Sequence, residues 1–150
     1  IGGTNRHYAS CSGTSMAAPH ASGLLAVASE WWRARTGGDD FSPAMAKALL
    51  VASAVDMGVA DVPNNQEGWG RVQLTRLMAP GVSAAYLDQT HRFGESGEAW
   101  NWYCDVDVPG EPLRVVLAWS DAAGAAGANP ALVANPLAIP AGTAIVIPTR

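Results

Sequence analysis

The N-terminal part of the chain carries small and hydrophobic residues at helical spacing. From Ser15 to about Arg35 the sequence SMAAPHASGLLAVASEWWRAR is rich in Ala and Leu and almost uncharged before Glu30. Such a stretch predicts a helix that is buried on most of its sides. Pro19 suits only the first turn of a helix, where backbone amides have no intrahelical acceptor. We therefore expect the helix to begin near Ser15.

A second helix is predicted after a glycine-containing loop at residues 36–40. Ser42 is a favourable N-cap and Pro43 suits the first helical position. The following AMAKALLVASAV extends this helix to a stop at Gly58.

Glycines indicate a tight turn farther along the chain. Gly68 and Gly70 precede a short element, and residues 79–81 then form a linker. The hydrophobic positions of the short element are Val72, Leu74 and Leu77.

Beyond this linker the pattern changes from helical spacing to alternation. Residues 100–108 (WNWYCDVDV) alternate, and residues 113–120 (LRVVLAWS) repeat the alternation after a PGEP turn. These two segments predict an antiparallel hairpin. In the Ala-, Gly- and Pro-rich stretch from residue 122 to 150, only Ile145–Ile147 suggests a strand. One face of the hairpin would carry Trp100, Trp102, Cys104, Val106 and Val108 and, from the second strand, Leu113, Val115, Leu117 and Trp119.

The composition is that of a globular protein, and it narrows the function classes. Hydrophobic residues make up 49% of the chain and charged residues 15%, near globular norms, and the apolar runs are too short to span a bilayer. The formal net charge is −4 and Lys47 is the only lysine, so no basic stripe is available to neutralise phosphates. We expect no membrane span and no nucleic-acid partner.

The two cysteines, Cys11 and Cys104, lie far apart, with no CxxC pair and no His at metal-ligand spacing. A zinc site therefore has little support, and a disulfide is permitted but not implied. The chain starts at Ile1 with no leader before its body, so we expect an internal piece of a longer protein.

Candidate chemistry concentrates in SGTSMAAPHASG, from Ser12 to Gly23. Ser15 stands at the mouth of the predicted helix, where free amides and the macrodipole favour the oxyanion that forms when a serine attacks a carbonyl. Gly13 lets a substrate backbone approach, and Ala17 and Ala18 keep the helix surface small. A serine at a helix N-terminus is in most proteins only a cap, so position alone leaves both roles open.

The longer string resembles a known motif. GTSMAAPH is similar to the sequence around the nucleophile of the subtilisin-like serine proteases, and GLLAVASEWW, SPAMAKALLVASA and GWGRVQL resemble elements that follow it in that family. The resemblance covers about residues 9–78 and implies the C-terminal helical part of a doubly wound α/β peptidase domain. It assigns Ser15 as nucleophile, with its own N–H in the oxyanion hole. The supporting motif residues are Gly13, Thr14, Met16, Ala17, Pro19 and His20.

The resemblance also implies where the rest of the catalytic machinery lies. The family's triad runs in the order Asp, His, Ser, so the acid and the base are expected upstream of Ser15 and outside this chain. His20 is structural in the family motif, and His7 lacks the family's glycine-rich surroundings. The implied parent is a secreted endopeptidase that cleaves proteins or peptides through an acyl-enzyme. The chain alone is expected to be inactive and without a cofactor, because loss of the base lowers turnover of subtilisin about a million-fold.

The second half bears a looser resemblance. DVDVPGEPLRVVLAWSDAAG is similar to a jelly-roll-like β-sandwich that follows the catalytic domain in some bacterial subtilases, whereas ALVANPLAIPAGTAIVIPTR departs from it. We therefore expect a subtilisin-like part at residues 1–79 and an incomplete all-β sandwich with a divergent tail at residues 80–150. Asp105, Asp107 and Asp121 are either a solvated strand face or ligands of structural calcium.

Two other functions remain open. In an α/β-hydrolase, GTSMA would be a nucleophile elbow with Asp105 or Asp121 and then a histidine as partners. However, His91 precedes both aspartates, Ala18 replaces the elbow glycine, and no alternating strand leads into the serine. A non-catalytic module would instead hold a partner or polysaccharide on Tyr103 and neighbouring tryptophans. We also expect poor solubility, because the first helix would expose apolar surface without an upstream sheet.

Overall fold

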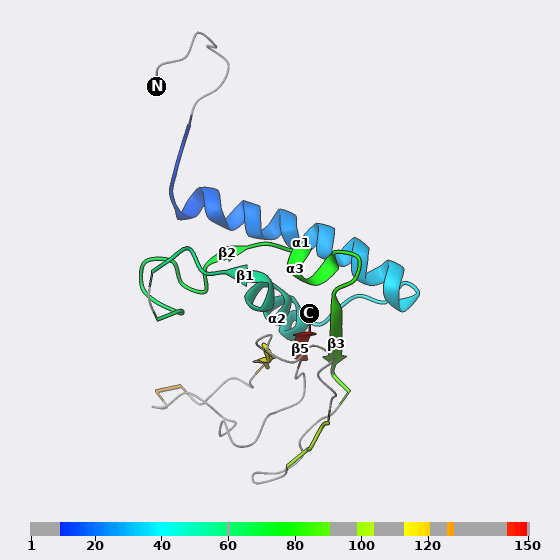
Figure 1. Cartoon of the computed structure of the whole chain (residues 1–150). Helices are drawn as coiled ribbons and strands as arrows, with labels where there is room; N and C mark the ends of the chain where they lie inside the picture. Colours follow the sequence, from blue (N-terminus) through cyan, green and yellow to red (C-terminus); the bar gives the residue numbers. More distant parts are fainter. Residues whose placement is uncertain are drawn as a thin grey trace.

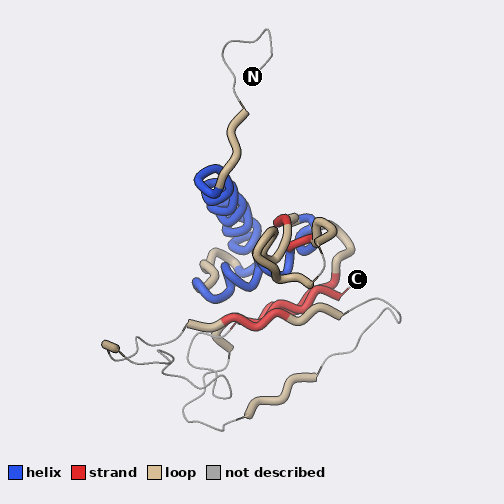
Figure 2. Tube along the Cα trace, turned by 90° about the vertical axis from the view of Figure 1, so that its left-hand side faces the viewer, coloured by secondary structure: helices blue, strands red, loops and turns tan. Residues whose placement is uncertain are grey.

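The computed structural model describes residues 10–59, 61–90, 99–103, 113–120, 126–127 and 144–149. It combines helices and strands, as expected for an α/β protein. The helices lie on one side of the molecule, and β3, β4 and β5 form a layer against α2 (Figures 1 and 2). The elements are α1 (Thr14–Thr36), α2 (Pro43–Ser53), β1 (Ala54–Val55), β2 (Arg71–Val72), α3 (Thr75–Met78), β3 (Ser83–Asp88), β4 (Val116–Ala118) and β5 (Ala144–Thr149).

The first predicted helix is confirmed as α1, which begins one residue before Ser15. It ends where Gly37 adopts a left-handed conformation with φ 85°, so that its N–H donates to the Arg33 carbonyl. The predicted first-turn place of Pro19 is wrong, because Pro19 is the sixth helical residue after a start at Thr14. Its ring nitrogen carries no hydrogen for the Ser15 carbonyl four residues earlier.

Burial of α1 on most of its sides is not what the described residues show. Only Ala28 and Trp32 are buried in α1, and every residue from Thr14 to His20 is exposed. The reason is visible in Figures 1 and 2, where the N-terminal half of α1 extends beyond the other described elements. Two large apolar side chains are therefore left open to solvent, with Met16 40% and Val27 56% exposed.

Local signals set the start of α2 as predicted. Ser42 is the N-cap, its hydroxyl accepts the Met45 N–H at 3.0 Å, and Pro43 occupies the first helical position. The predicted stop at Gly58 is wrong, because α2 ends at Ser53 and the chain turns into β1.

The short strand β1 pairs antiparallel with β2, the strand that follows the predicted glycine turn. Gly68 and Gly70 have φ of 60° and 97°, as such a turn requires. A Cβ on Gly70 would lie 2.3 Å from the Val55 carbonyl oxygen, so only glycine lets the two backbones approach this closely. This pairing explains why the helix stops early.

The larger sheet has the strand order β3-β5-β4, with both pairs antiparallel. The strand suggested by Ile145–Ile147 is confirmed within β5, whereas β3 was not predicted. The second strand of the predicted hairpin is present as β4, but it pairs with β5, and residues 100–103 form no strand. Residues 104–108 lie outside the described part of the chain.

The alternation predicted for this segment is present in residues 113–118, and the apolar row from Leu113 to Leu117 lies on the more exposed face. Leu113, Val115 and Leu117 are 43%, 56% and 38% exposed, while Ala118 is buried. Small Ala118 fits against α2, and Arg114 on the same face reaches two backbone carbonyls at the end of α2. The face of β4 that turns inward is thus the one from which Arg114 reaches backbone acceptors.

The core lies between α2, the C-terminal part of α1 and the sheet. The buried core residues come from both sides of the predicted domain boundary between residues 79 and 80. That boundary stays a prediction. Tyr86 of β3 packs against the core, and its hydroxyl donates to the Leu77 carbonyl at 3.2 Å. The buried cluster comprises Trp32, Ala44, Met45, Ala48, Leu49, Ala52, Leu77 and Ala118.

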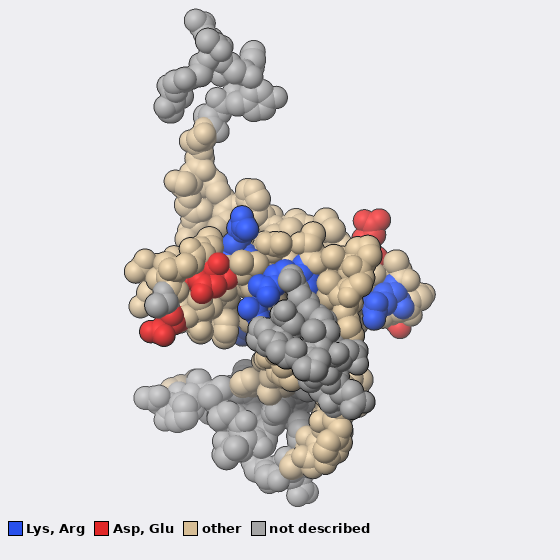
Figure 3. Space-filling model, in the orientation of Figure 1, with Lys and Arg blue, Asp and Glu red and all other residues tan. Residues whose placement is uncertain are grey.

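Charged residues of both signs occur on the face drawn in Figure 3. Among the helices that are described, none is long and apolar enough to cross a membrane. The described ranges contain no group of three or more His, Cys, Asp and Glu side chains that would hold a metal ion. Several residues from the sequence hypotheses lie outside the described part: His7, His91, Cys104, Asp105, Asp107 and Asp121.

Candidate functional site

The candidate site is the N-terminal turn of α1, where Ser15 is the second helical residue and is exposed. Gly13 is the N-cap, with φ 146° and ψ 169°, a conformation that favours glycine. The N–H groups of Met16 and Ala17 donate to the Gly13 carbonyl at 3.0 and 3.1 Å. These two bonds close the first turn and fix the backbone of Ser15 within it.

Ser15 does not act as a helix cap. The N-cap is Gly13, and no side-chain hydrogen bond caps this end of α1. The amides of Thr14 and Ser15 precede the first residues that can have an intrahelical acceptor. No acidic residue lies in the first turn, so the positive end of the helix dipole is not neutralised there. The turn therefore presents a hydroxyl next to free N–H donors, as acyl transfer needs.

His20 is held away from the serine by a local bond. Its Nδ1 lies 2.6 Å from the Met16 carbonyl oxygen, and a carbonyl only accepts, so Nδ1 carries the hydrogen and donates it. His20 is five positions after Ser15, which places the two side chains on different faces of the helix. Both residues are described, and no hydrogen bond joins them. This geometry fits a structural histidine.

The remaining motif residues occupy the same two turns. All are exposed, and the nearest atom to a Cβ built on Gly13 is the Met16 sulfur at 3.9 Å. At Gly13 it is thus the backbone conformation, and not lack of space, that requires glycine. The cluster consists of Gly13, Thr14, Met16, Ala17 and Pro19.

An aromatic cluster at the other end of α1 was not foreseen from the sequence. The Tyr86 ring lies 5.5 Å from Trp31 and 5.8 Å from Trp32, and the Arg35 guanidinium lies 5.4 Å from the Tyr86 centroid. Burial raises the pKa of Tyr86, and the nearby Arg35 charge opposes this in part. The alternation in SAAYLD, with Tyr86 and Asp88 on one face, was the available signal.

An ion pair closes the loop that follows α1. Arg33 Nε lies 2.7 Å from Asp40 Oδ1, and this bond lowers the pKa of the Asp40 carboxyl and raises that of Arg33. Both side chains are more than half exposed, so the pair adds little to stability.

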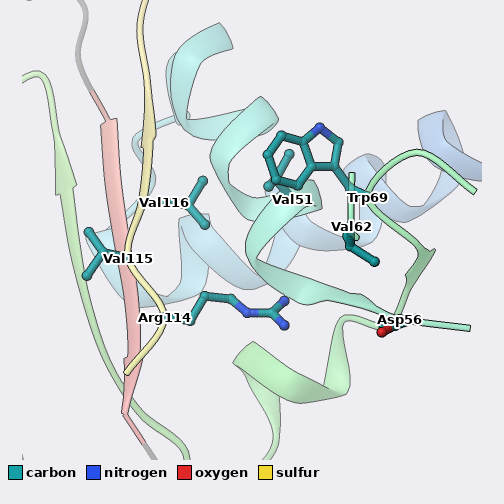
Figure 4. Close-up of a pocket in the computed structure, with 7 residues that line it drawn as sticks. All are labelled: Val51, Asp56, Val62, Trp69, Arg114, Val115 and Val116. Carbon is teal, nitrogen blue, oxygen red and sulfur yellow. The ribbon is translucent and has the colours of Figure 1, made fainter. Parts of the chain in front are cut away.

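A separate hollow of about 310 Å³ lies beside α2 (Figure 4). Its walls are mostly apolar, and its charged residues are Asp56 and Arg114. None of its lining residues belongs to the serine motif. The lining consists of Val51, Asp56, Val62, Trp69, Arg114, Val115 and Val116.

Comparison with known proteins matches the same part of the chain. Residues 2–70 match the model of the subtilase family. A curated relative, the extracellular serine protease of Serratia marcescens, is 41% identical over 70 residues, which are 47% of this chain and 6% of that protein. The chain thus spans a small part of the length of this relative. No solved structure matches the chain. Residues 2–70, which include the whole serine motif, are thus similar to the subtilase family.

Proposed function

We propose that this chain is part of a serine-type endopeptidase in which Ser15 is the nucleophile. The observation that carries the proposal is the position of Ser15, one residue inside the start of α1, within a segment that matches the subtilase family. The Ser15 hydroxyl attacks the scissile carbonyl and gives its proton to the general base, while the Ser15 N–H donates to the oxyanion. The peptide C–N bond then breaks, the amine leaves with that proton, and an acyl-enzyme remains on Ser15. The substrate is a protein or peptide.

The general base and the acid that orients it come from outside these 150 residues. Within the described part, the imidazole of His20 is engaged with its own helix and is not bonded to Ser15. The complete peptidase has a doubly wound α/β domain, to which residues 1–79 contribute the C-terminal helices. Residues 80–150 begin a β-sandwich. The whole protein is secreted, in keeping with its similarity to the extracellular serine protease of Serratia marcescens.

The α/β-hydrolase alternative lacks the element it needs. A nucleophile elbow requires a strand that leads into the serine. Residues 10–12 are described, and they precede α1 without forming a strand. Among the residues described before α1, therefore, none forms a strand that leads into Ser15.

A chimera tests the role of Ser15 in a complete enzyme. The matching segment of the Serratia marcescens protease is replaced by the corresponding part of residues 2–70, and hydrolysis of a peptide substrate is measured. Ser15→Ala is expected to lower kcat by about 10⁶-fold, since the reaction loses its nucleophile. Ser12→Ala is the matched control, because Ser12 is exposed in the same motif but lies outside α1, and it should retain activity.

A second experiment tests the origin of the base. The 150-residue chain is treated with a fluorophosphonate, which labels a serine only when a base activates it. No labelling of Ser15 is expected. Labelling that disappears in Ser15→Ala would mean that a base lies within these residues, and would overturn this part of the proposal.

A further inference from the structure

Both ends of α2 are held by residues from beyond the segment that matches the subtilase family. At the N-terminus the Asp88 carboxylate accepts the Ser42 N–H at 2.8 Å and the Ser42 hydroxyl at 2.5 Å. At the C-terminus Nη1 of Arg114 donates to the carbonyls of Ala52 at 3.2 Å and Ala54 at 2.7 Å. Figure 4 shows Arg114 extending from the strand side toward this end of the helix.

The signs of the two charges match the dipole of α2. A carboxylate is stabilising at a helix N-terminus, and a guanidinium at a C-terminus. The helix has no charges of its own for this purpose, since its first turn contains no acidic residue and its last turn no basic one. Asp88 and Arg114 therefore supply, from the sheet side, the terminal charges that the sequence of α2 lacks.

The sheet register sets the two charges one helix length apart. Asp88 and Ala118 both pair with Ala144, so they lie at the same level of the sheet. Arg114 precedes Ala118 by four residues, which is about 14 Å along an extended chain. The 11 residues of α2 span about 16 Å. A slip of one residue in β3 or β4 would move a charge by about 3.4 Å and break its contact.

From this geometry we propose that Asp88 and Arg114 form a clamp that makes the sheet and α2 one folding unit. The clamp is independent of the proposed catalytic role, because neither residue contacts the serine motif. The clamp means that residues beyond the 79–81 linker stabilise the segment that matches the subtilase family. The shared core supports this, since Ala118 of β4 packs with Met45 and Leu49 of α2 in one buried cluster.

Charge-removing variants of the 150-residue chain test the clamp. Asp88→Asn and Arg114→Met are compared with Asp39→Asn and Arg71→Met, which remove equal charges from exposed side chains that make no hydrogen bond within the described residues. Amide hydrogen exchange is measured separately for α2, for β3 and for β4. Hydrogen bonds to charged groups are among the stronger ones, so each clamp variant should speed exchange throughout α2 about tenfold or more. The controls should stay within about twofold.

The test is decided by whether amide exchange in α2 and in the strands changes together. The clamp predicts that Asp88→Asn speeds exchange in α2 and β3 together, and that Arg114→Met does so in α2 and β4. Faster exchange in the strands with α2 unchanged would overturn the proposal, because the strands would then be a separate module. Should Asp88→Asn not fold, Asp88→Glu keeps the charge but displaces it by one methylene. That variant must still speed exchange in α2 more than the Asp39→Asn control does, and equal rates would refute the clamp.

Discussion

Replacing Tyr86 by Phe tests how β3 is joined to the helices. The substitution keeps the ring contacts with Trp31 and Trp32 but removes the hydroxyl that donates to the Leu77 carbonyl. An intramolecular hydrogen bond contributes about 0.5–1.5 kcal/mol. The Leu77 carbonyl is left without this donor, so we expect the free energy of unfolding to fall by about 1 kcal/mol at neutral pH.

The pH dependence gives the same residue a second signature. Burial raises the pKa of Tyr86 in the folded chain above its ordinary value of 10.0. A raised folded-state pKa means that the stabilisation is complete below about pH 10 and is lost as the pH rises through the folded-state value. The native chain should therefore lose stability above about pH 10 faster than Tyr86→Phe does, because the variant has no proton to release at this position.

Urea unfolding followed by tryptophan fluorescence measures both effects, since Trp31 and Trp32 lie against Tyr86. Tyr103→Phe is the control, because Tyr103 is 87% exposed. A Tyr86→Phe variant as stable as the native chain at neutral pH would refute the hydrogen bond. A difference between the two that stays constant from about pH 8 to pH 11 would refute the raised pKa.

Three further predictions concern the turn, the core and the exposed helix. Gly70→Ala should lower the free energy of unfolding in urea by at least about 2 kcal/mol, because the added Cβ collides with the Val55 carbonyl. Gly38→Ala, also at positive φ but in open space, should lower it less, and equal decreases would contradict the contact. Leu49→Ala empties a fully buried site in α2 and should lower the free energy of unfolding by about 2–5 kcal/mol, whereas a loss below about 1 kcal/mol would argue against this core. Val27→Glu places a charge on the exposed side of α1 and should raise the soluble, monomeric fraction in size-exclusion chromatography. An unchanged fraction would mean that this surface does not drive association.

Local signals in the sequence predicted much of the helical part. The Ser42 cap followed by Pro43 placed the start of α2, and the glycine turn at Gly68 and Gly70 placed the start of β2. These features depend on residues close together in the chain, so spacing and residue type suffice. The end of α2 was misplaced because β1 forms only through pairing with β2, whose partners lie 16 or more residues away.

The features that the sequence did not predict depend on contacts between residues far apart in the chain. Asp88 lies 46 residues from Ser42, and Arg114 lies 60 residues from Ala54. Arg114 lies on the face of β4 that turns toward α2, because the helix end offers carbonyl acceptors that a polar–apolar pattern does not reveal. The start of α1 at the serine motif was predicted closely, and the exposure of Met16 and Val27 agrees with the apolar surface expected of this helix without an upstream sheet. The chemical role of Ser15 stays a prediction.

The most direct test of the central proposal is to identify the residue that a fluorophosphonate labels in the chimeric protease. The chimera, its Ser15→Ala variant and its Ser12→Ala variant are treated with the reagent, digested and analysed by peptide mass spectrometry. The account predicts a modified Ser15 in the chimera and in Ser12→Ala, and no modification in Ser15→Ala. An active chimera labelled at another serine, or one still labelled after Ser15→Ala, would contradict it.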